Sequence, residues 1–132
     1  MKTKIVVLMM GIVAAVPAVA HHSFAAAFDF NKPVALAGTV TKVEWTNPHA
    51  RIYMEVKDAD GKVSSWECEL GSPNTLMHKG WTRNSLKPGD QISVSGFLAK
   101  DGDKVANARE VKLANGKKVF AGSEYSEGET KQ

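Results

Sequence analysis

Histidine supplies the most usable chemistry in this chain, and two of its four histidines are adjacent, at His21 and His22. If His21 begins a processed chain, its α-amine and imidazole can chelate one metal ion, and His22 or the distant His49 can add a further nitrogen. Nitrogen donors of this kind favour Cu(II), followed by Ni(II) and Zn(II). The pattern therefore predicts a transition-metal site at His21, His22 and His49, with copper as the first candidate. The alternative is a soluble, cleavable terminus with no physiological metal.

The residues before His21 decide whether its amine is free. Lys2 and Lys4 precede an uncharged stretch over residues 5–16, and small residues at Ala18 and Ala20 then form a cleavage signal. This is the plan of a secretory signal peptide. The apolar run is too short to span a bilayer. We therefore expect residues 1–20 to be removed after Ala20, leaving a periplasmic or secreted bacterial protein without a membrane anchor.

Composition without this leader indicates one small, nearly neutral domain. The whole chain has 17 Lys and Arg against 14 Asp and Glu, and loss of Lys2 and Lys4 brings the net charge to about +1. Cys68 is the only cysteine, so no intramolecular disulfide can form. The expected organisation is a histidine-containing arm over residues 21–32, a β domain over 33–121 and a disordered tail over 122–132.

Period-two patterns predict the first three strands. The first follows Pro33 and contains a β-bulge near Thr41 and Lys42, where the apolar pattern slips by one residue. Apolar residues alternate from Ala50 to Val56 in the second strand, and the third turns Trp66, Cys68 and Leu70 inward. Phe24, Phe28 and Phe30 are expected to pin the arm onto the domain.

The turn between the second and third strands sets their register. A three-residue loop, Ala59-Asp60-Gly61 with Gly61 in the left-handed conformation, keeps the apolar faces matched. In that register Met54 lies opposite Trp66 and Ile52 lies opposite Cys68. Arg51 lies opposite Glu69, which we expect to neutralise it.

A short helix is predicted next. Ser72 is its cap, Pro73 its first residue, Leu76 and Met77 its apolar contacts and Gly80 its stop. His78 is expected to be a solvated residue of this helix. A turn over residues 87–90 then leads to strands over residues 91–99 and 105–113, with a short hairpin addition over 118–120.

This order predicts a five-stranded OB-like Greek-key barrel, with one short helix between strands three and four. An open β-sandwich is the second choice, but the lone central helix argues against it. The aromatic and cation needed for nucleic-acid binding, Tyr53 and Arg51, lie opposite Glu67 and Glu69. Together with the low net charge, this argues against a nucleic-acid partner.

Four segments also carry a family resemblance: residues 21–24 (HHSF), 43–49 (VEWTNPH), 69–74 (ELGSPN) and 86–90 (LKPGD). Through them the chain resembles domain-of-unknown-function family 6152 over nearly the whole mature domain. The resemblance implies a small exported bacterial protein, periplasmic, with no assigned activity. Cys68 departs from the family pattern, since its strand resembles family strands with an apolar residue at this position; this argues against a thiol-based function and favours a buried, unreactive Cys68.

The predicted function is that of a small periplasmic binding module for copper or another transition metal. A metal-free accessory module is the alternative; it would bind a partner protein or small ligand at the loop end of the barrel. A third hypothesis is a copper-dependent oxidative enzyme that uses the α-amine, His21 and His49. The chain carries no nucleophile-elbow, phosphate-loop or dinucleotide motif, so enzymatic activity is left open and non-catalytic binding is favoured.

Overall fold

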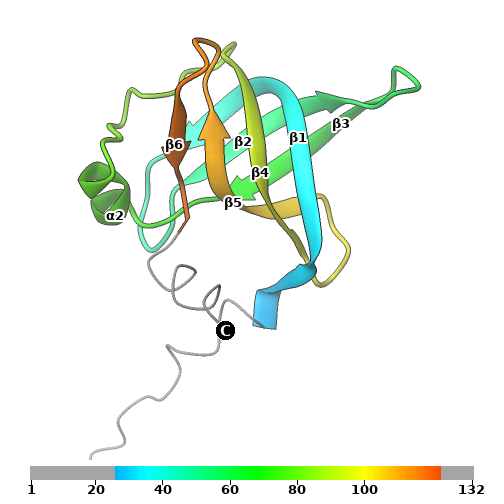
Figure 1. Ribbon diagram of the computed structural model, residues 1–132, viewed down its shortest axis with the longest axis horizontal. Coiled ribbons are helices and arrows are strands. Elements are labelled where there is room, and N and C mark those ends of the chain that lie inside the picture. The colour runs from blue at the N-terminus through cyan, green and yellow to red at the C-terminus, as the bar shows by residue number, and fades with distance from the viewer. Residues whose placement is uncertain (1–25, 123–132) are drawn as a thin grey trace, which may run out of the picture.

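The computed structural model describes residues 26–122, which form one six-stranded sheet and a short helix (Figure 1). The elements are β1 (Phe28–Glu44), β2 (Arg51–Lys57), β3 (Val63–Glu69), α2 (Pro73–His78), β4 (Gln91–Ala99), β5 (Val105–Lys112) and β6 (Lys118–Phe120). Neighbouring strands follow the order β3-β2-β1-β4-β5-β6, and β3 also pairs in parallel with β5. That last pairing closes the sheet into a ring. The protein is therefore mainly β with a helix between β3 and β4, and it has six strands where the sequence predicts five and a short addition.

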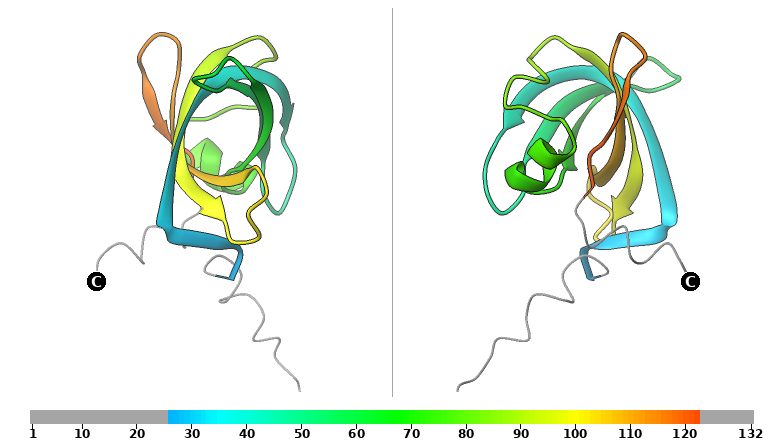
Figure 2. Two further views of the ribbon diagram at one scale, coloured as in Figure 1. Left: turned by 90° about the vertical axis from the view of Figure 1, so that its right-hand side faces the viewer. Right: turned by 60° about the vertical axis from the view of Figure 1, so that its left-hand side comes forward.

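β1 is a long, bent strand that pairs with both β4 and β2. Its first part pairs with β4, from Phe28 opposite Ala99 onward, and its last part pairs with β2. The predicted bulge is confirmed, because the register with β2 shifts between Val40 and Lys42. Figure 2 shows β1 curving around the ring.

β1 also begins earlier than predicted, at Phe28 and not after Pro33. Phe28 is buried, and the ring of Phe30 meets the edge of Phe97 at 5.1 Å between centroids. These two aromatics pin the start of the strand as expected, while Phe24 lies outside the described residues.

The register of β2 and β3 is the predicted one. Met54 pairs with Trp66, Ile52 with Cys68 and Arg51 with Glu69. The Asp58 N–H donates to the carbonyl of Lys62 at 2.8 Å, which leaves three residues in the loop. Gly61 ends that loop with φ 86°, the left-handed conformation that glycine adopts without steric cost.

The core lies inside the ring. Its buried members are Leu36, Val40, Ala50, Ile52, Met54, Val56, Cys68, Leu70, Leu76, Trp81, Leu86, Ile92, Val94, Ala106, Ala108, Val111 and Ala121. Trp66 is half-buried and packs against this cluster. Burial raises the pKa of the Cys68 thiol to about 12 and keeps it protonated, as expected of an unreactive cysteine.

α2 has the predicted ends. The Ser72 hydroxyl accepts a hydrogen bond from the Thr75 N–H, and Gly80 follows the helix with φ 92°. The Trp81 N–H donates to Leu76 O and the Gly80 N–H to Met77 O, the two bonds of a Schellman motif. The prediction that Met77 contacts the core is wrong, because Met77 is 54% exposed. In so short a helix the inward face is taken by Pro73 and Leu76, three residues apart.

Candidate functional site

His49 lies just before β2, where three separate segments of the chain meet. The Ala50 N–H donates to Gly71 O at 3.0 Å, and the Leu70 N–H donates to Ala50 O at 2.9 Å. The Gly71 N–H in turn donates to Ala121 O, just after β6. These bonds extend the β2–β3 ladder past the strand ends and hold the backbone around His49. We call this region the His49 end.

The imidazole of His49 is held in one tautomer. Its Nδ1 lies 3.0 Å from Leu70 O, and a carbonyl oxygen can only accept, so Nδ1 carries the proton. The lone pair of the neutral ring is then on Nε2. The side chain is 35% exposed, which leaves it accessible to solvent. Metal-binding histidines commonly have this second hydrogen bond, which orients the ring.

The carboxylate of Glu69 completes the surroundings of the ring. Its Oε1 lies 3.8 Å from Nδ1 of His49. The sequence predicts that Glu69 neutralises Arg51, but Arg51 Nε instead pairs with Glu67 Oε1 at 2.8 Å. A long side chain reaches its diagonal neighbour across a strand pair as readily as the residue directly opposite. Glu69 therefore faces His49 with its charge.

The neighbouring part of β1 and β2 is a network of paired polar groups. The hydroxyl of Tyr53 donates to Glu44 Oε2 at 3.2 Å, and Lys42 Nζ lies 2.6 Å from Glu44 Oε1. Burial and the nearby Glu67 carboxylate raise the pKa of Tyr53, so it stays a neutral donor.

Of the three predicted metal ligands, only His49 lies in the part of the chain that the structure describes. His21 and His22 lie outside the described residues, as do the predicted leader and most of the predicted tail. His78 is exposed on α2, as predicted. Within residues 26–122, His, Cys, Asp and Glu side chains form no group of three able to hold a metal ion.

Asn107 is a residue that sequence reasoning missed. It pairs with Glu69 across the parallel β3–β5 contact, on the side of the strands turned away from the core. Its side chain is nevertheless 1% exposed, and its Oδ1 has no hydrogen-bond partner. A buried acceptor without a donor is costly and is rare in folded proteins.

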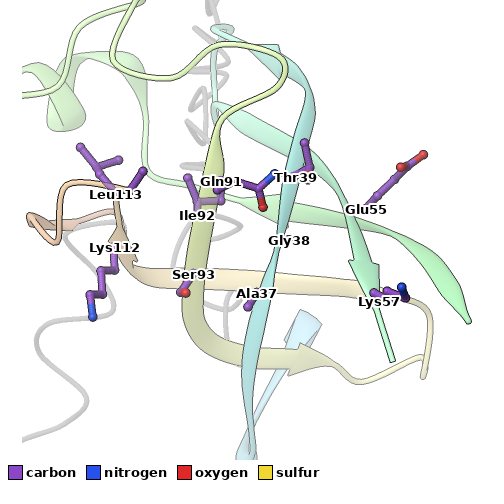
Figure 3. A pocket seen from close by; sticks show the side chains of 11 residues that line it. Ala37, Gly38, Thr39, Glu55, Lys57, Gln91, Ile92, Ser93, Lys112 and Leu113 are labelled. Carbon is purple, nitrogen blue, oxygen red and sulfur yellow. Dashed lines mark hydrogen bonds between the residues drawn. The ribbon is translucent and has the colours of Figure 1, made fainter. Parts of the chain in front are cut away.

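A groove of about 570 Å³ lies at the other end of β2 (Figure 3). Small side chains, including Ala37 and Ser93, form its floor, and Lys57 and Lys112 lie on opposite sides of it. In the described part of the chain, neither lysine is paired with a carboxylate. A second hollow of about 320 Å³ adjoins it and shares Ala37, Ser93 and Lys112.

The contact between His49 and the Leu70 carbonyl could have been predicted from the β2–β3 register. Continuing the pairing of Arg51 with Glu69 by two residues brings residue 49 beside residue 71, next to the Leu70 carbonyl. Asn107 and the groove carry no such signal, because they depend on strands that are distant in the sequence.

Within residues 26–122, no helix is long and apolar enough to cross a membrane.

The chain belongs to a family of unknown function (DUF6152), whose model matches residues 10–108. This confirms the resemblance carried by the four short segments. The matched residues begin inside the predicted leader and include His21, His22 and His49. No curated protein matches the chain.

Proposed function

We propose that this protein is a small binding module for a transition-metal ion, with Cu(II) as the first candidate. Nε2 of His49 is one ligand, and the α-amine and imidazoles of His21 and His22 supply the others. The observation that carries the proposal is the hydrogen bond from His49 Nδ1 to Leu70 O, which leaves Nε2 as the lone-pair nitrogen. Glu69, 3.8 Å from the ring, adds a negative charge that favours a bound cation.

We further propose that the ring is an OB-like barrel of five strands, to which β6 is an addition. Two features support this. β3 and β5 close the ring in parallel while the other neighbours are antiparallel, and α2 lies between β3 and β4. OB folds commonly bind their ligands at strands two and three and the adjoining loops, which is where His49 lies.

The proposal requires a free amine on His21, and therefore export and cleavage after Ala20. The basic start, the apolar stretch and the small residues before the junction support a signal peptide and a periplasmic address. Intact mass measurement of the protein purified from its own periplasm tests this directly. A chain that begins at His21 is expected; a chain that keeps residues 1–20 would contradict the site.

The groove supports a second candidate function, a metal-free module that binds a small anionic ligand or an acidic partner protein. Lys57 and Lys112 lie on opposite sides of a hollow large enough for such a group, and no carboxylate in residues 26–122 pairs with them. This places the ligand away from the loop end that the sequence favours. Binding in this case would be lost in a Lys57→Ala, Lys112→Ala double variant and kept in His49→Ala.

The experiment that tests the metal proposal is calorimetric Cu(II) titration, with electron paramagnetic resonance, of protein beginning at His21. Two variants are compared with it: one with an extra Gly before His21, and His49→Ala. His78→Ala is the matched control, since it removes an exposed histidine from α2. We expect one-to-one binding that weakens at least about tenfold in both variants and is unchanged in the control.

The opposite result is equally clear. Binding that is indifferent to His49→Ala, and no tighter than that of a free peptide copying residues 21–31, would mean that the terminus chelates copper without the domain. The metal proposal would then be rejected, and the groove would become the leading site.

A further inference from the structure

The side chains of the groove lie in rows that follow the strand pairing. Ala37 of β1 pairs with Ser93 of β4, which pairs with Lys112 of β5, and Lys57 continues the β1–β2 pairing beside Ala37 (Figure 3). All four residues are exposed, and they point outward because their neighbours along each strand point toward the core. One row across the sheet therefore has a lysine at each end and two small side chains between them. We call it the lysine row.

The lysine row suits a single anionic group. Lys112 lies directly opposite Lys118 of β6, whose ammonium group already pairs with Glu110 at 3.2 Å. Like charges opposite one another in a sheet are unfavourable, so an anion beside Lys112 would relieve this pair. Lys57 is three strands from Lys112, roughly 14 Å between Cα atoms, and both flexible four-carbon stems can turn toward a group between them. The hydroxyl of Ser93 can donate to the same group from below.

The next row along β4 offers acceptors in place of cations. Thr39 of β1 pairs with Glu55 of β2 on one side and with Gln91 of β4 on the other. Gln91 Nε2 donates to Thr39 Oγ1 at 2.6 Å, which leaves Gln91 Oε1 and the Glu55 carboxylate as acceptors. This acceptor row is two residues from the lysine row, roughly 7 Å along the strands. A ligand that fits both rows carries an anion at one end and hydroxyl donors at the other.

The carboxylates beside the lysine row argue against a long polyanion. Glu55 lies on one side of the row, and Glu110, opposite Ser95, lies on the other. An acidic protein segment or a nucleic-acid backbone that followed β4 would pass both carboxylates and be repelled. Among residues 26–122, none of those that line the groove is aromatic, so bases would find no ring on which to stack. A small ligand with one anionic group is therefore favoured.

The charge of the lysine row favours a phosphate monoester as that group. A phosphate monoester carries a charge of about −2 at neutral pH and has three acceptor oxygens, which matches two ammonium groups and a hydroxyl. A single carboxylate or a phosphodiester carries one negative charge and would leave one lysine uncompensated. The acceptor row then requires that the rest of the ligand carry hydroxyl groups.

We propose that the groove binds a small phosphorylated polyol. Its phosphate lies over Ala37 and Ser93 and is bound by Lys57 and Lys112, and its hydroxyl groups donate to the acceptor row. This inference rests on the second function proposed above, the metal-free module that binds an anion, and it names the class of ligand.

The first test is an NMR titration of the ¹⁵N-labelled protein used for copper binding, with glycerol 3-phosphate, inorganic phosphate, succinate and glycerol as probes. We expect the backbone signals of Ala37, Ser93 and Gln91 to shift with both phosphates and not with glycerol. Glycerol 3-phosphate should bind about fivefold more tightly than inorganic phosphate, because its hydroxyl groups add hydrogen bonds to the acceptor row. Equal affinity for the two phosphates overturns the assignment of a polyol.

Succinate separates this inference from the function on which it rests. If succinate binds at the same residues as tightly as glycerol 3-phosphate, the groove accepts anions in general, so the phosphate assignment fails while the anion-binding function survives. If none of the three anions shifts these signals, both the assignment and the anion-binding function fail.

The second test measures the affinities of variants whose changed side chains are all exposed. The Lys57→Ala, Lys112→Ala double variant should bind both phosphates at least about tenfold more weakly, whereas Lys100→Ala, which removes a lysine outside the groove, should bind them unchanged. Glu55→Ala should weaken glycerol 3-phosphate binding about fivefold without weakening inorganic phosphate binding, because it removes an acceptor and a negative charge. Equal losses in the double variant and Lys100→Ala overturn the proposal, as does Glu55→Ala protein that binds glycerol 3-phosphate as tightly as the parent.

Discussion

The His49 end and the groove lie at opposite ends of β2, and they differ in what they offer a ligand. At the His49 end the polar groups are already oriented, since the ring bonds to Leu70 O and lies beside Glu69. The groove has volume, but its floor is small side chains, and its two free lysines are exposed. Oriented donors lose little entropy when a ligand binds, whereas flexible lysines must first be ordered. The comparison shows that a hollow of about 570 Å³ need not be better prepared for a ligand than a histidine whose ring is already oriented.

The strands near the His49 end are also tightly packed. Asn107 lies in the wall of the ring, where it pairs with Phe97 of β4, and its backbone carbonyl lies against Gly96. A Cβ built on Gly96 would overlap the backbone carbonyl oxygen of Asn107. The backbones of β4 and β5 are therefore in close contact beside Asn107.

The largest expected effect comes from breaking that close contact. Gly96→Ala should destabilise the protein by about 3 kcal/mol, because the new methyl group must push two paired strands apart. Ser95→Ala, at the neighbouring exposed position of β4, should change stability by less than about 0.5 kcal/mol. Urea unfolding followed by circular dichroism measures both. Equal stabilities for the two variants would show that β4 and β5 can move apart at Gly96 without a measurable loss of stability.

A second prediction concerns the interior behind Glu69. The pKa of Cys68 is about 12 in the folded protein against an ordinary value of 9.0, so the folded state holds its proton where the unfolded state loses it. The stability linked to this thiol is therefore complete below pH 9 and is lost as pH rises toward 12. Between pH 8 and 10 the parent should lose about 1.4 kcal/mol more than Cys68→Ala.

Urea unfolding of the two proteins at each pH supplies that difference. Slow alkylation of Cys68 at pH 8 in the folded protein should accompany it, since the thiolate is the reactive form. Parallel pH profiles for parent and variant would mean that solvent reaches the thiol, and that the wall behind Glu69 is less tightly packed than its burial indicates.

The smallest predicted effect compares two carboxylates at opposite ends of the β2–β3 pair, Glu69 and Glu55. Glu69→Gln should weaken Cu(II) binding about fivefold, corresponding to about 1 kcal/mol, because it removes a negative charge beside the metal-binding histidine. Glu55→Gln removes an equally charged group from the groove and should leave the affinity unchanged. Calorimetric titration at two salt concentrations measures both, since the effect of Glu69 should shrink with added salt. A similar loss of Cu(II) affinity in both variants would mean that binding responds to the net charge of the protein and not to the position of Glu69.

Much of the fold could be predicted because its signals are local. Alternation from Ala50 to Val56 and a glycine at position 61 are sufficient to set the β2–β3 register, since a one-residue slip would turn the apolar side chains outward. Ser72 and Gly80 mark the ends of α2 for similarly local reasons, the missing hydrogen-bond partners at helix ends. The same reasoning was wrong for Met77, where the short helix had no second inward position.

The site was predictable only in part. His49 was identified from its residue type and its position after a proline turn, and its role as a ligand remains a prediction. Its actual partner, Leu70 O, follows from the register, but the choice of Glu67 over Glu69 by Arg51 does not. That choice depends on side-chain reach across a twisted strand pair, and periodicity carries no information about reach.

The amino-acid sequence by itself determined the order of the strands, the β2–β3 register, the ends of the helix and membership of the family. Only the tertiary structure decided that β3 meets β5, and with that contact the burial of Asn107 and the position of the groove. The physical reason is the range of the interactions. Turns, caps and alternation act between residues a few positions apart, whereas the closing pair joins Glu69 to Asn107, and nothing local in either strand specifies that partner.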